Sequence, residues 1–143
     1  MADQAILRRR ARTKFGDAAA DFFWTSAGLE QASRPVVSRR RAARFAASGQ
    51  RRVVDLACGC GADAVALAQA GIPVTGVELD PTTAVLAAAN LARVSADSAV
   101  QVGDAQEVAG RLLAPGAPVF CDPARRSAKG RSWRVEDLSP GWG

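Results

Sequence analysis

From residue 53 onward, short apolar runs alternate with longer Ala-rich segments along the chain. Short apolar runs bounded by Gly, Pro or Asp are typical of strands, whereas the longer segments between them favour helices. The runs predict strands over Val53–Ala57, Pro73–Leu79, Ala99–Val102 and Ala117–Cys121. The segments between them predict helices over Asp63–Ala70, Pro81–Val94 and Ala105–Leu113. Strands that alternate with helices at this spacing indicate βαβ units and an α/β protein with a mostly parallel sheet.

The N-terminal third of the chain is expected to be helical. A helix is predicted over residues 2–24, and its aromatic end is expected to dock on the body of the protein through Phe22, Phe23 and Trp24. Gly28 is expected to stop a helix. Because proline suits the first turn of a helix, a second helix is predicted from Pro35 to about Ser48. Its inward positions are expected to be Val36, Val37, Ala43 and Phe45.

The predicted sheet is smaller than usual. Open doubly wound sheets usually have five or more strands, and the polar residues after the fourth predicted strand are too few to supply several more. We therefore divide the chain into a basic helical segment over residues 1–50, a Rossmann-like half-domain over residues 51–126 and an irregular tail over residues 127–143. An apparently incomplete sheet of about four strands favours a fragment of a longer protein, and an unusually small sheet is the alternative.

Charge is unevenly distributed along the 143 residues. Residues 1–52 carry twelve Lys and Arg against four Asp and Glu, a net of +8, whereas residues 53–143 carry seven against ten, a net of −3. A basic segment ahead of a mildly acidic domain fits a polyanionic partner, and we expect nucleic acid bound through residues 8–52. The alternative is a solvated helical face that is rich in arginine.

The cysteines and the apolar runs predict the compartment of the protein and whether it binds a metal or a membrane. Cys58, Cys60 and Cys121 have no metal-type spacing and the chain has no histidine, so we expect no metal site and a reducing cytoplasm. No run approaches about 18 apolar residues and no apolar signal core follows Met1, so we expect a soluble protein with no membrane partner.

The chain is organised around the segment Val53-Val54-Asp55-Leu56-Ala57-Cys58-Gly59-Cys60-Gly61, a strand that enters a turn with two glycines. Without a Cβ, Gly59 and Gly61 can turn the chain sharply and let a ligand lie against backbone N–H groups. A dinucleotide or an adenosyl compound suits such a loop. By itself the motif is weak evidence, because tight turns alone demand glycine.

Acidic residues recur where the predicted strands end, which is where open α/β sheets bind ligands. They are Asp55, Glu78, Asp104 and Asp122. Glu78 lies 19 residues beyond Gly59, and a carboxylate there can accept hydrogen bonds from both ribose hydroxyls. Plain structural alternatives exist: Glu78 could be a solvated strand end with Asp80 as its competitor, Asp104 a helix cap, and Asp122-Pro123 a turn. Four such residues in order, one strand apart, favour a ligand site.

Residues 52–126 resemble the class I S-adenosylmethionine-dependent methyltransferases, since Val53–Gly61 looks like the first motif of that family with Ala57 in place of the commoner glycine. The resemblance implies S-adenosylmethionine as cofactor. It implies that the loop after Asp55 holds the methionine end through the backbone of Ala57, Cys58, Gly59 and Gly61. It further implies that Glu78 binds the ribose, with Leu79 against adenine and Asp104 and Ala105 at the adenine amino group. Asp122 and Pro123 would lie where the methyl acceptor meets the sulfonium.

A closer resemblance rests on Lys14-Phe15-Gly16, Gly28-Leu29-Glu30-Gln31-Ala32 and Asp122-Pro123-Ala124-Arg125-Arg126. These segments look like bacterial, largely actinobacterial, methyltransferases with a THUMP-like C-terminal domain. Members of that group are far longer than 143 residues, so the resemblance implies that this chain is an N-terminal part. RNA as the substrate is implied only by the THUMP analogy.

The predicted chemistry asks little of the protein beyond positioning. Methyl transfer mainly requires that the reacting atoms of donor and acceptor be held about 3 to 3.5 Å apart. Asp122 is the best candidate to accept a hydrogen bond or a proton from an acceptor amine, and the Asp122-Pro123 backbone could offer a carbonyl. Arg125 and Arg126 are expected either to contact an acceptor phosphate or to form a solvated basic turn.

Two alternatives belong to other functional classes. Gly59-Cys60-Gly61-Ala62-Asp63-Ala64 also fits the pattern of an NAD(P)-binding oxidoreductase with an acidic residue about 20 positions on. Against it stand Asp104, the Asp122-Pro123 pair and the lack of a hydride-transfer partner such as His or Tyr. The second alternative is an inactive remnant or a module that binds nucleic acid through residues 8–52.

Overall fold

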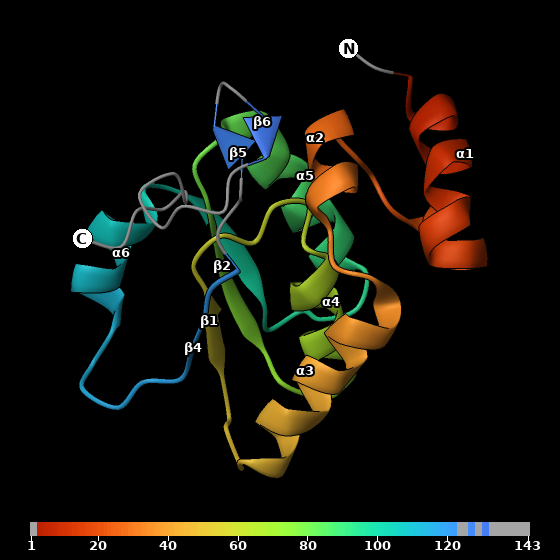
Figure 1. Cartoon of the computed structure of the whole chain (residues 1–143). Helices are drawn as coiled ribbons and strands as arrows, with labels where there is room; N and C mark the ends of the chain where they lie inside the picture. The colour runs from red at the N-terminus through yellow and green to blue at the C-terminus, as the bar shows by residue number, and fades with distance from the viewer. Residues whose placement is uncertain (1–2, 123–125, 128–129, 132–143) are drawn as a thin grey trace.

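Four parallel strands form the centre of the molecule in the computed structural model, which describes residues 3–122, 126–127 and 130–131. The strands are β1 (Val53–Asp55), β2 (Val74–Glu78), β3 (Ala99–Val102) and β4 (Val119–Phe120). Their order across the sheet is β3-β2-β1-β4, with all neighbours parallel (Figure 1). The expected α/β class and the parallel four-stranded sheet are therefore confirmed, and each strand except β3 is shorter than its apolar run.

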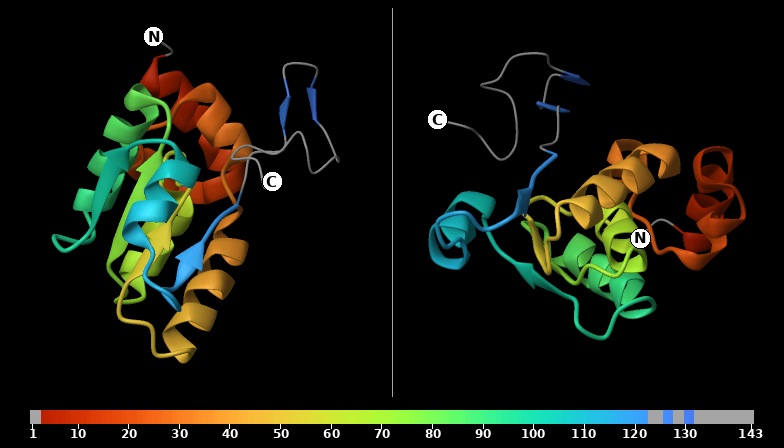
Figure 2. Two further views of the ribbon diagram at one scale, coloured as in Figure 1. Left: turned by 90° about the vertical axis from the view of Figure 1, so that its left-hand side faces the viewer. Right: turned by 90° about the horizontal axis from the view of Figure 1, so that it is seen from below.

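Helices cover both faces of this sheet. They are α3 (Pro35–Ala47), α4 (Ala62–Gln69), α5 (Pro81–Ala92) and α6 (Ala105–Leu112). Figures 1 and 2 show α6 on one side and the other three on the opposite side. The core between the sheet and α3, α4 and α5 is made of small and branched aliphatic residues, Ala42, Val53, Ala64, Val65, Leu67, Ile72, Val74 and Leu91. A smaller core beneath α6 holds Leu56, Val77, Ala105 and Val108.

The N-terminal region folds as three short helices, not as one long one. These are α1 (Gln4–Phe15), a 3-10 helix η1 (Gly16–Asp21) and α2 (Ser26–Gln31). The prediction of a single helix over residues 2–24 is wrong, because Gly16 takes a positive φ of 60° that ends α1. Gly28 does not stop a helix but lies inside α2. It has to be glycine for a packing reason, since a Cβ there would collide with Cys60 Sγ.

The aromatic residues of this region dock on the body of the protein, as expected. The Trp24 ring is almost fully buried and lies 4.7 Å from the Phe15 ring and 5.0 Å from the Phe22 ring, between centroids. Trp24 and Gln4 exchange two hydrogen bonds through the Trp24 backbone, at 2.8 and 3.0 Å. Cys60, from the glycine loop, belongs to the same buried cluster. The N-terminal helices thus pack directly on the loop that follows β1.

Asn90 on α5 fixes this docking. Its side chain donates to the carbonyl oxygens of Phe23 (2.9 Å) and Cys60 (2.8 Å) and accepts from the Phe23 N–H (2.8 Å). Asn90 is only 3% exposed, so water cannot reach these polar groups and the three hydrogen bonds satisfy them instead. One buried amide therefore joins α5, the N-terminal region and the glycine loop.

The inward face of α3 differs from the expected one. Ser38 and Ala42 are buried and Phe45 packs against the core, whereas Val36 and Val37 are 50% and 38% exposed. Ala43 is also exposed. The reason is the close approach of α3 to α4, which selects small side chains one turn apart and turns the first two valines outward.

Two further strands, β5 (Arg126–Ser127) and β6 (Gly130–Arg131), form a short antiparallel pair that no apolar run predicts. None of the described helices combines the length and the hydropathy that a membrane span requires.

Asn90→Ala should lower the free energy of unfolding by about 2–4 kcal/mol, because it leaves buried Phe23 and Cys60 backbone groups without partners. Urea unfolding followed by circular dichroism measures this. The matched control is Gln69→Ala, an exposed amide on α4, which should change stability by about 0.5 kcal/mol or less. Equal effects of the two substitutions would show that the Asn90 hydrogen bonds do not hold the N-terminal region.

Candidate active site

The carboxyl ends of the four strands bring the predicted acidic residues to one edge of the sheet. Asp55 ends β1 and Glu78 ends β2, while Asp104 and Asp122 each follow the last residue of their strand by two positions. Hydrogen bonds between neighbouring strands fix the relative positions of these ends. The Gly103 N–H donates to the Glu78 carbonyl (3.0 Å), and the Leu56 N–H donates to the Phe120 carbonyl (2.9 Å). The chain leaves β1 toward β2 and β3 on one side and places β4 on the other. This reversal of strand order is where open α/β sheets bind ligands.

The glycine loop between β1 and α4 has the conformation that the sequence predicts. Gly59 and Gly61 have positive φ values of 54° and 87°, which L-residues with a side chain rarely adopt. Gly61 is the N-cap of α4, and a Cβ there would lie at ordinary contact distance, 3.6 Å, from the backbone of Ala87 on α5. The positive φ values, rather than a lack of space, are therefore what requires glycine at these two positions.

Most amide groups of this loop already donate within the chain. The N–H groups of Ala57, Cys58, Gly59 and Gly61 donate to Asp55 Oδ1, Val77 O, Glu78 Oε2 and Cys58 O. The loop is thus shaped before any ligand arrives. The loop therefore lets a ligand lie close to its backbone, rather than offering the ligand a row of free N–H donors.

The loop cysteines are packing residues. Cys58 Sγ would lie 3.0 Å from a Cβ at Gly76, so its side chain fills the space beside β2. Cys60 Sγ faces the N-terminal region, 3.5 Å from the Thr25 N–H. Burial raises the pKa of both thiols above the ordinary range, and all three cysteines are free. Thiols in such surroundings stay protonated and unreactive.

Glu78 lies across the mouth of the glycine loop. Its Oε2 accepts from the Gly59 N–H and its Oε1 from the Asp80 N–H, both at 3.0 Å. Each carboxylate oxygen retains a further acceptor site, so Glu78 can still bind two hydroxyl groups. Asp80, its competitor in the sequence, is committed to capping α5 through Thr83 at 2.7 Å, and these hydrogen bonds lower the pKa of Asp80. The adjacent Leu79 side chain is 62% exposed.

Asp104 fulfils its structural alternative. Its Oδ1 accepts from the N–H groups of Gln106 (2.8 Å) and Glu107 (3.2 Å) and so caps α6. The Ala105 side chain is buried beneath the sheet, which leaves only its backbone to contact a ligand. Capping occupies one carboxylate oxygen and fixes Asp104 at the edge, so it does not remove a role in binding.

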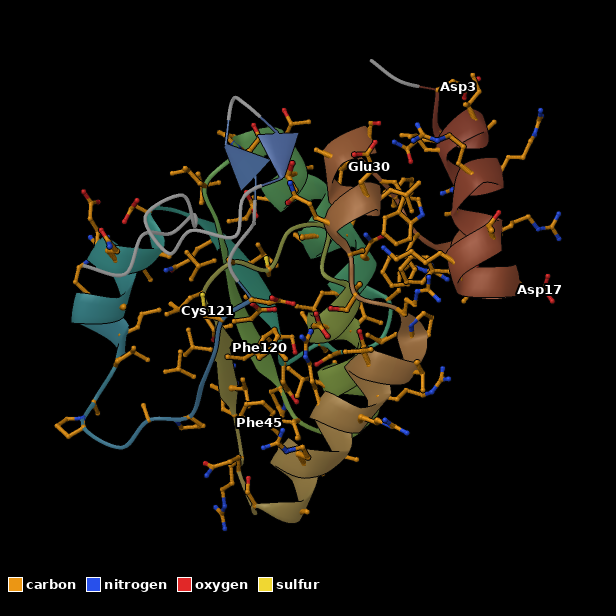
Figure 3. The ribbon with its side chains drawn as sticks, in the orientation of Figure 1. Asp3, Asp17, Glu30, Phe45, Phe120 and Cys121 are labelled. Carbon is orange, nitrogen blue, oxygen red and sulfur yellow. The ribbon has the colours of Figure 1, made fainter. Side chains whose placement is uncertain are left out.

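Asp122 is the most exposed of the four acidic residues, with 41% of its side chain accessible. It directly follows Phe120 and Cys121 in the chain, which Figure 3 labels at the end of β4. Pro123 and Arg125 lie outside the described residues. Arg126 lies in β5, and only its backbone is described.

Arg41 on α3 contacts this edge, which the sequence did not predict. Its Nη2 pairs with Asp122 Oδ2 at 3.0 Å and its Nη1 with Asp63 Oδ2 at 3.1 Å. Among residues 3–122, no other Lys or Arg forms an ion pair with an acidic residue of this edge. In the structure Ser38, Ala42 and Phe45 point inward, and Arg41 lies on the same side of α3. The sequence pattern alone placed mostly other residues inward and so gave no signal for Arg41.

Asp55 is a buried carboxyl among other carboxylates. It is 1% exposed, and burial raises its pKa to about 8, with Asp63, Asp122 and Glu78 adding repulsion. At neutral pH the group is therefore mostly protonated and can donate as well as accept a hydrogen bond.

Asp55 should make stability fall as pH rises. The unfolded chain loses this proton near the ordinary pKa of 3.8, whereas the folded chain keeps it up to about 8, so unfolding releases a proton between these values. Asp55→Asn removes that effect. The variant should gain about 2–3 kcal/mol over the wild type between pH 5 and pH 7 in urea unfolding. The exposed control Asp97→Asn should show no such trend, and a pH-independent difference for Asp55→Asn would contradict the assignment.

Known proteins share this architecture. No family model matches the chain. An uncharacterised S-adenosylmethionine-dependent methyltransferase of Mycobacterium tuberculosis is 31% identical over 148 residues, an alignment that covers 100% of this chain and 39% of the relative. The chain thus spans about two fifths of the length of the curated relative it matches.

Solved structures agree. The crystal structure of a protein described as a methyltransferase from Porphyromonas gingivalis W83 superposes with a TM-score of 0.72 at 28% identity, over 97% of this chain and 35% of that one. Cofactor-bound Rv0187 from MTB gives a TM-score of 0.60 at 25% identity, over 80% of this chain and 57% of that one. The N-terminal helices and the four-stranded parallel sheet therefore have the fold of the class I S-adenosylmethionine-dependent methyltransferases.

Proposed function

We propose that the chain is the cofactor-binding part of an S-adenosylmethionine-dependent methyltransferase. The observation that carries the proposal is the gathering of the glycine loop, Asp55, Glu78 and Asp104 at one edge of the sheet, beside the reversal of strand order. The name of the M. tuberculosis relative supports the same activity and cofactor.

In this proposal the chain's own groups bind and orient the cofactor, which supplies a methyl group on a positively charged sulfur. Glu78 holds the ribose hydroxyls with the acceptor sites that Gly59 and Asp80 leave open. The exposed Leu79 covers one face of adenine. Asp104 accepts a hydrogen bond from the adenine amino group, with the Ala105 backbone beside it. The backbone of Ala57–Gly61 lies against the methionine end, and protonated Asp55 stays neutral beneath it.

Asp122 and Pro123 form the acceptor side in this proposal. The partly exposed carboxylate of Asp122 can accept a hydrogen bond or a proton from an acceptor amine, and it lies across the strand reversal from the glycine loop. The reaction then needs only alignment of donor and acceptor, to which a chain without histidine is well suited.

We further propose that the chain is the N-terminal part of a longer enzyme with a THUMP-like domain. Its alignment with only 39% of the relative supports a longer protein, as does β4, whose described pairing is with β1 alone. The N-terminal position and the THUMP-like domain rest on the resemblance of the sequence segments. The free cysteines Cys58, Cys60 and Cys121 suit the reducing cytoplasm as its compartment.

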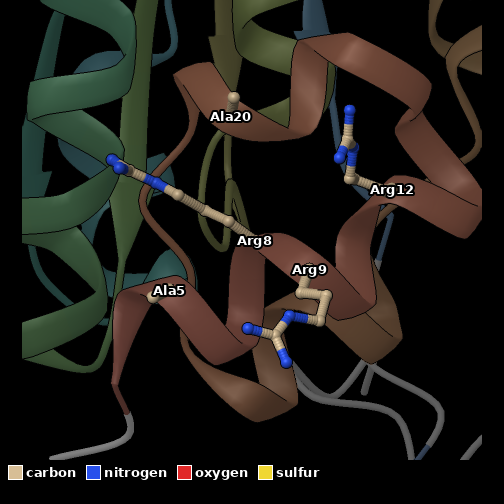
Figure 4. Close-up of a pocket in the computed structure, with 5 residues that line it drawn as sticks. All are labelled: Ala5, Arg8, Arg9, Arg12 and Ala20. Carbon is tan, nitrogen blue, oxygen red and sulfur yellow. The ribbon is translucent and has the colours of Figure 1, made fainter.

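RNA is the proposed substrate class. Arg39, Arg40 and Arg44 are exposed on α3 and available to phosphates. A second basic surface lies on α1 and η1, where Ala5, Arg8, Arg9 and Arg12 of α1 and Ala20 of η1 line an open hollow of about 330 Å³ (Figure 4). In that hollow Arg8 is committed to the Phe22 carbonyl and the Phe23 ring, and Arg12 pairs with Asp17 at 3.3 Å, although both Arg9 and Arg12 are exposed.

Calorimetric titration separates this proposal from its alternatives. S-adenosylhomocysteine should bind and NADH should not; the reverse would indicate an oxidoreductase, and binding of neither would indicate a remnant or a nucleic-acid module.

Glu78→Gln should weaken binding of S-adenosylhomocysteine about 10-fold or more, because charged hydrogen bonds to the ribose become neutral ones. The control Glu107→Gln, an exposed residue on α6, should leave the affinity unchanged.

The RNA proposal has its own test. Replacing Arg39, Arg40 and Arg44 together by glutamine should reduce the slope of log affinity against log salt for single-stranded RNA by about 2, since each lost phosphate contact contributes about 0.7. Gel-shift titrations at several salt concentrations measure the slope. The control is Arg111→Gln on α6. An unchanged slope in the triple variant would exclude this surface as the RNA contact.

A further inference from the structure

The Arg41 guanidinium contacts four other side chains, two of them the carboxylates of Asp63 and Asp122. Besides the two carboxylates, its Nη1 donates to Ser33 Oγ at 2.6 Å, and Ser33 donates in turn to Asp63 Oδ2 at 2.9 Å. The guanidinium carbon lies 5.0 Å from the centroid of the Phe120 ring. The Phe120 ring in turn packs edge-on against Phe45 of α3, with centroids 6.4 Å apart (Figure 3). The side chain is therefore fixed in position and in the plane of its fork.

The two carboxylates that Arg41 joins come from opposite sides of the strand reversal. Asp63 is in the first turn of α4, two residues after Gly61, whereas Asp122 follows β4. The Arg41 side chain, which extends from α3, thus links the start of α4 beside the glycine loop to the end of β4 on the acceptor side. The Asp63 side chain is only 13% exposed and that of Arg41 30%, so this end of the network is anchored where water competes little. Asp122, at 41%, is the exposed end.

Arginine suits this arrangement because its planar fork can address two carboxylates at once, in a geometry set by the protein. Lysine carries the same charge as a single point on a flexible stem. It could pair with Asp63 or Asp122, but it would not hold both at a fixed separation.

We propose that Arg41 is a positioning residue that holds the Asp122 carboxylate toward the sulfur of the bound cofactor. This inference rests on the proposed function and deepens it. Arg41 itself touches neither donor nor acceptor; it acts through Asp122. Without the Asp63–Arg41–Asp122 link, the half-exposed carboxylate is free to turn toward solvent.

The test uses a pair of ligands and needs no knowledge of the methyl acceptor. Sinefungin carries an ammonium group where the cofactor carries its methyl sulfonium, whereas S-adenosylhomocysteine is uncharged there. The ratio of their affinities for the 143-residue chain, measured by calorimetry, therefore reports a carboxylate held beside that position. Wild-type protein should prefer sinefungin by about 10-fold, as expected for one partly screened charge pair.

Arg41→Lys should reduce this preference to about twofold or less while changing the affinity for S-adenosylhomocysteine by less than threefold. Asp122→Asn should cause the same loss, and the double variant should lose no more than either single one, because both act on one carboxylate. The matched control is Arg52→Lys: Arg52 donates to the Asp97 carbonyl and to Thr75 at the opposite end of the strands and should keep the wild-type ratio.

A purely structural Arg41 would lower stability in the Lys variant and leave the ligand ratio unchanged, and that result would overturn the inference. The same holds if Asp122→Asn keeps the preference. Should Arg41→Lys not fold, Ser33→Ala loosens the same guanidinium without removing charge, and the ratio should fall about twofold; an unchanged ratio there also overturns the inference. Failure of the wild type to bind S-adenosylhomocysteine at all would instead contradict the proposed function, and the inference with it.

Discussion

Parallel pairing of four strands forces the acidic residues after each strand into one small region, and the rest of the site depends on how that charge is accommodated. Three means are visible. Asp55 is buried and keeps its proton, Glu78 and Asp104 accept backbone N–H groups, and Asp122 shares the Arg41 guanidinium with Asp63. An edge arranged in this way retains acceptor sites and negative potential, which suits a ligand that carries hydroxyl groups and a positive charge.

The N-terminal helices are part of this construction rather than an attached arm. Asn90 joins the Phe23 backbone to the Cys60 carbonyl, and Gly28 lets α2 pack on Cys60 itself. The shape of the glycine loop is therefore set from two sides, by β2 through Cys58 and by the N-terminal region through Cys60. Of the arginines on α3, Arg39, Arg40 and Arg44 are exposed, whereas Arg41 is turned toward the edge of the sheet.

The sequence predicted those features that follow from local pattern. Apolar runs located the four strands, two glycines located the loop, and the order of acidic residues located the edge where they meet. Features that depend on tertiary contact were missed. Val36 and Val37 were assigned inward because they are apolar, but close packing of α3 on α4 selects Ser38 and Ala42 instead. Arg41 was counted with the other basic residues of positions 8–52 as a candidate contact for a polyanionic partner, because nothing local shows that its partners lie 22 and 81 residues further on.

Binding of an adenosyl ligand at the carboxyl edge of this sheet can be followed by amide chemical-shift changes when S-adenosylhomocysteine is added to the isotopically labelled chain. The largest changes are expected at Gly59, Leu79 and Asp104. Residues at the opposite ends of the strands, such as Arg52 and Ser98, should be unaffected. Changes centred on those opposite ends, or no saturable change at any concentration, would contradict binding at this edge.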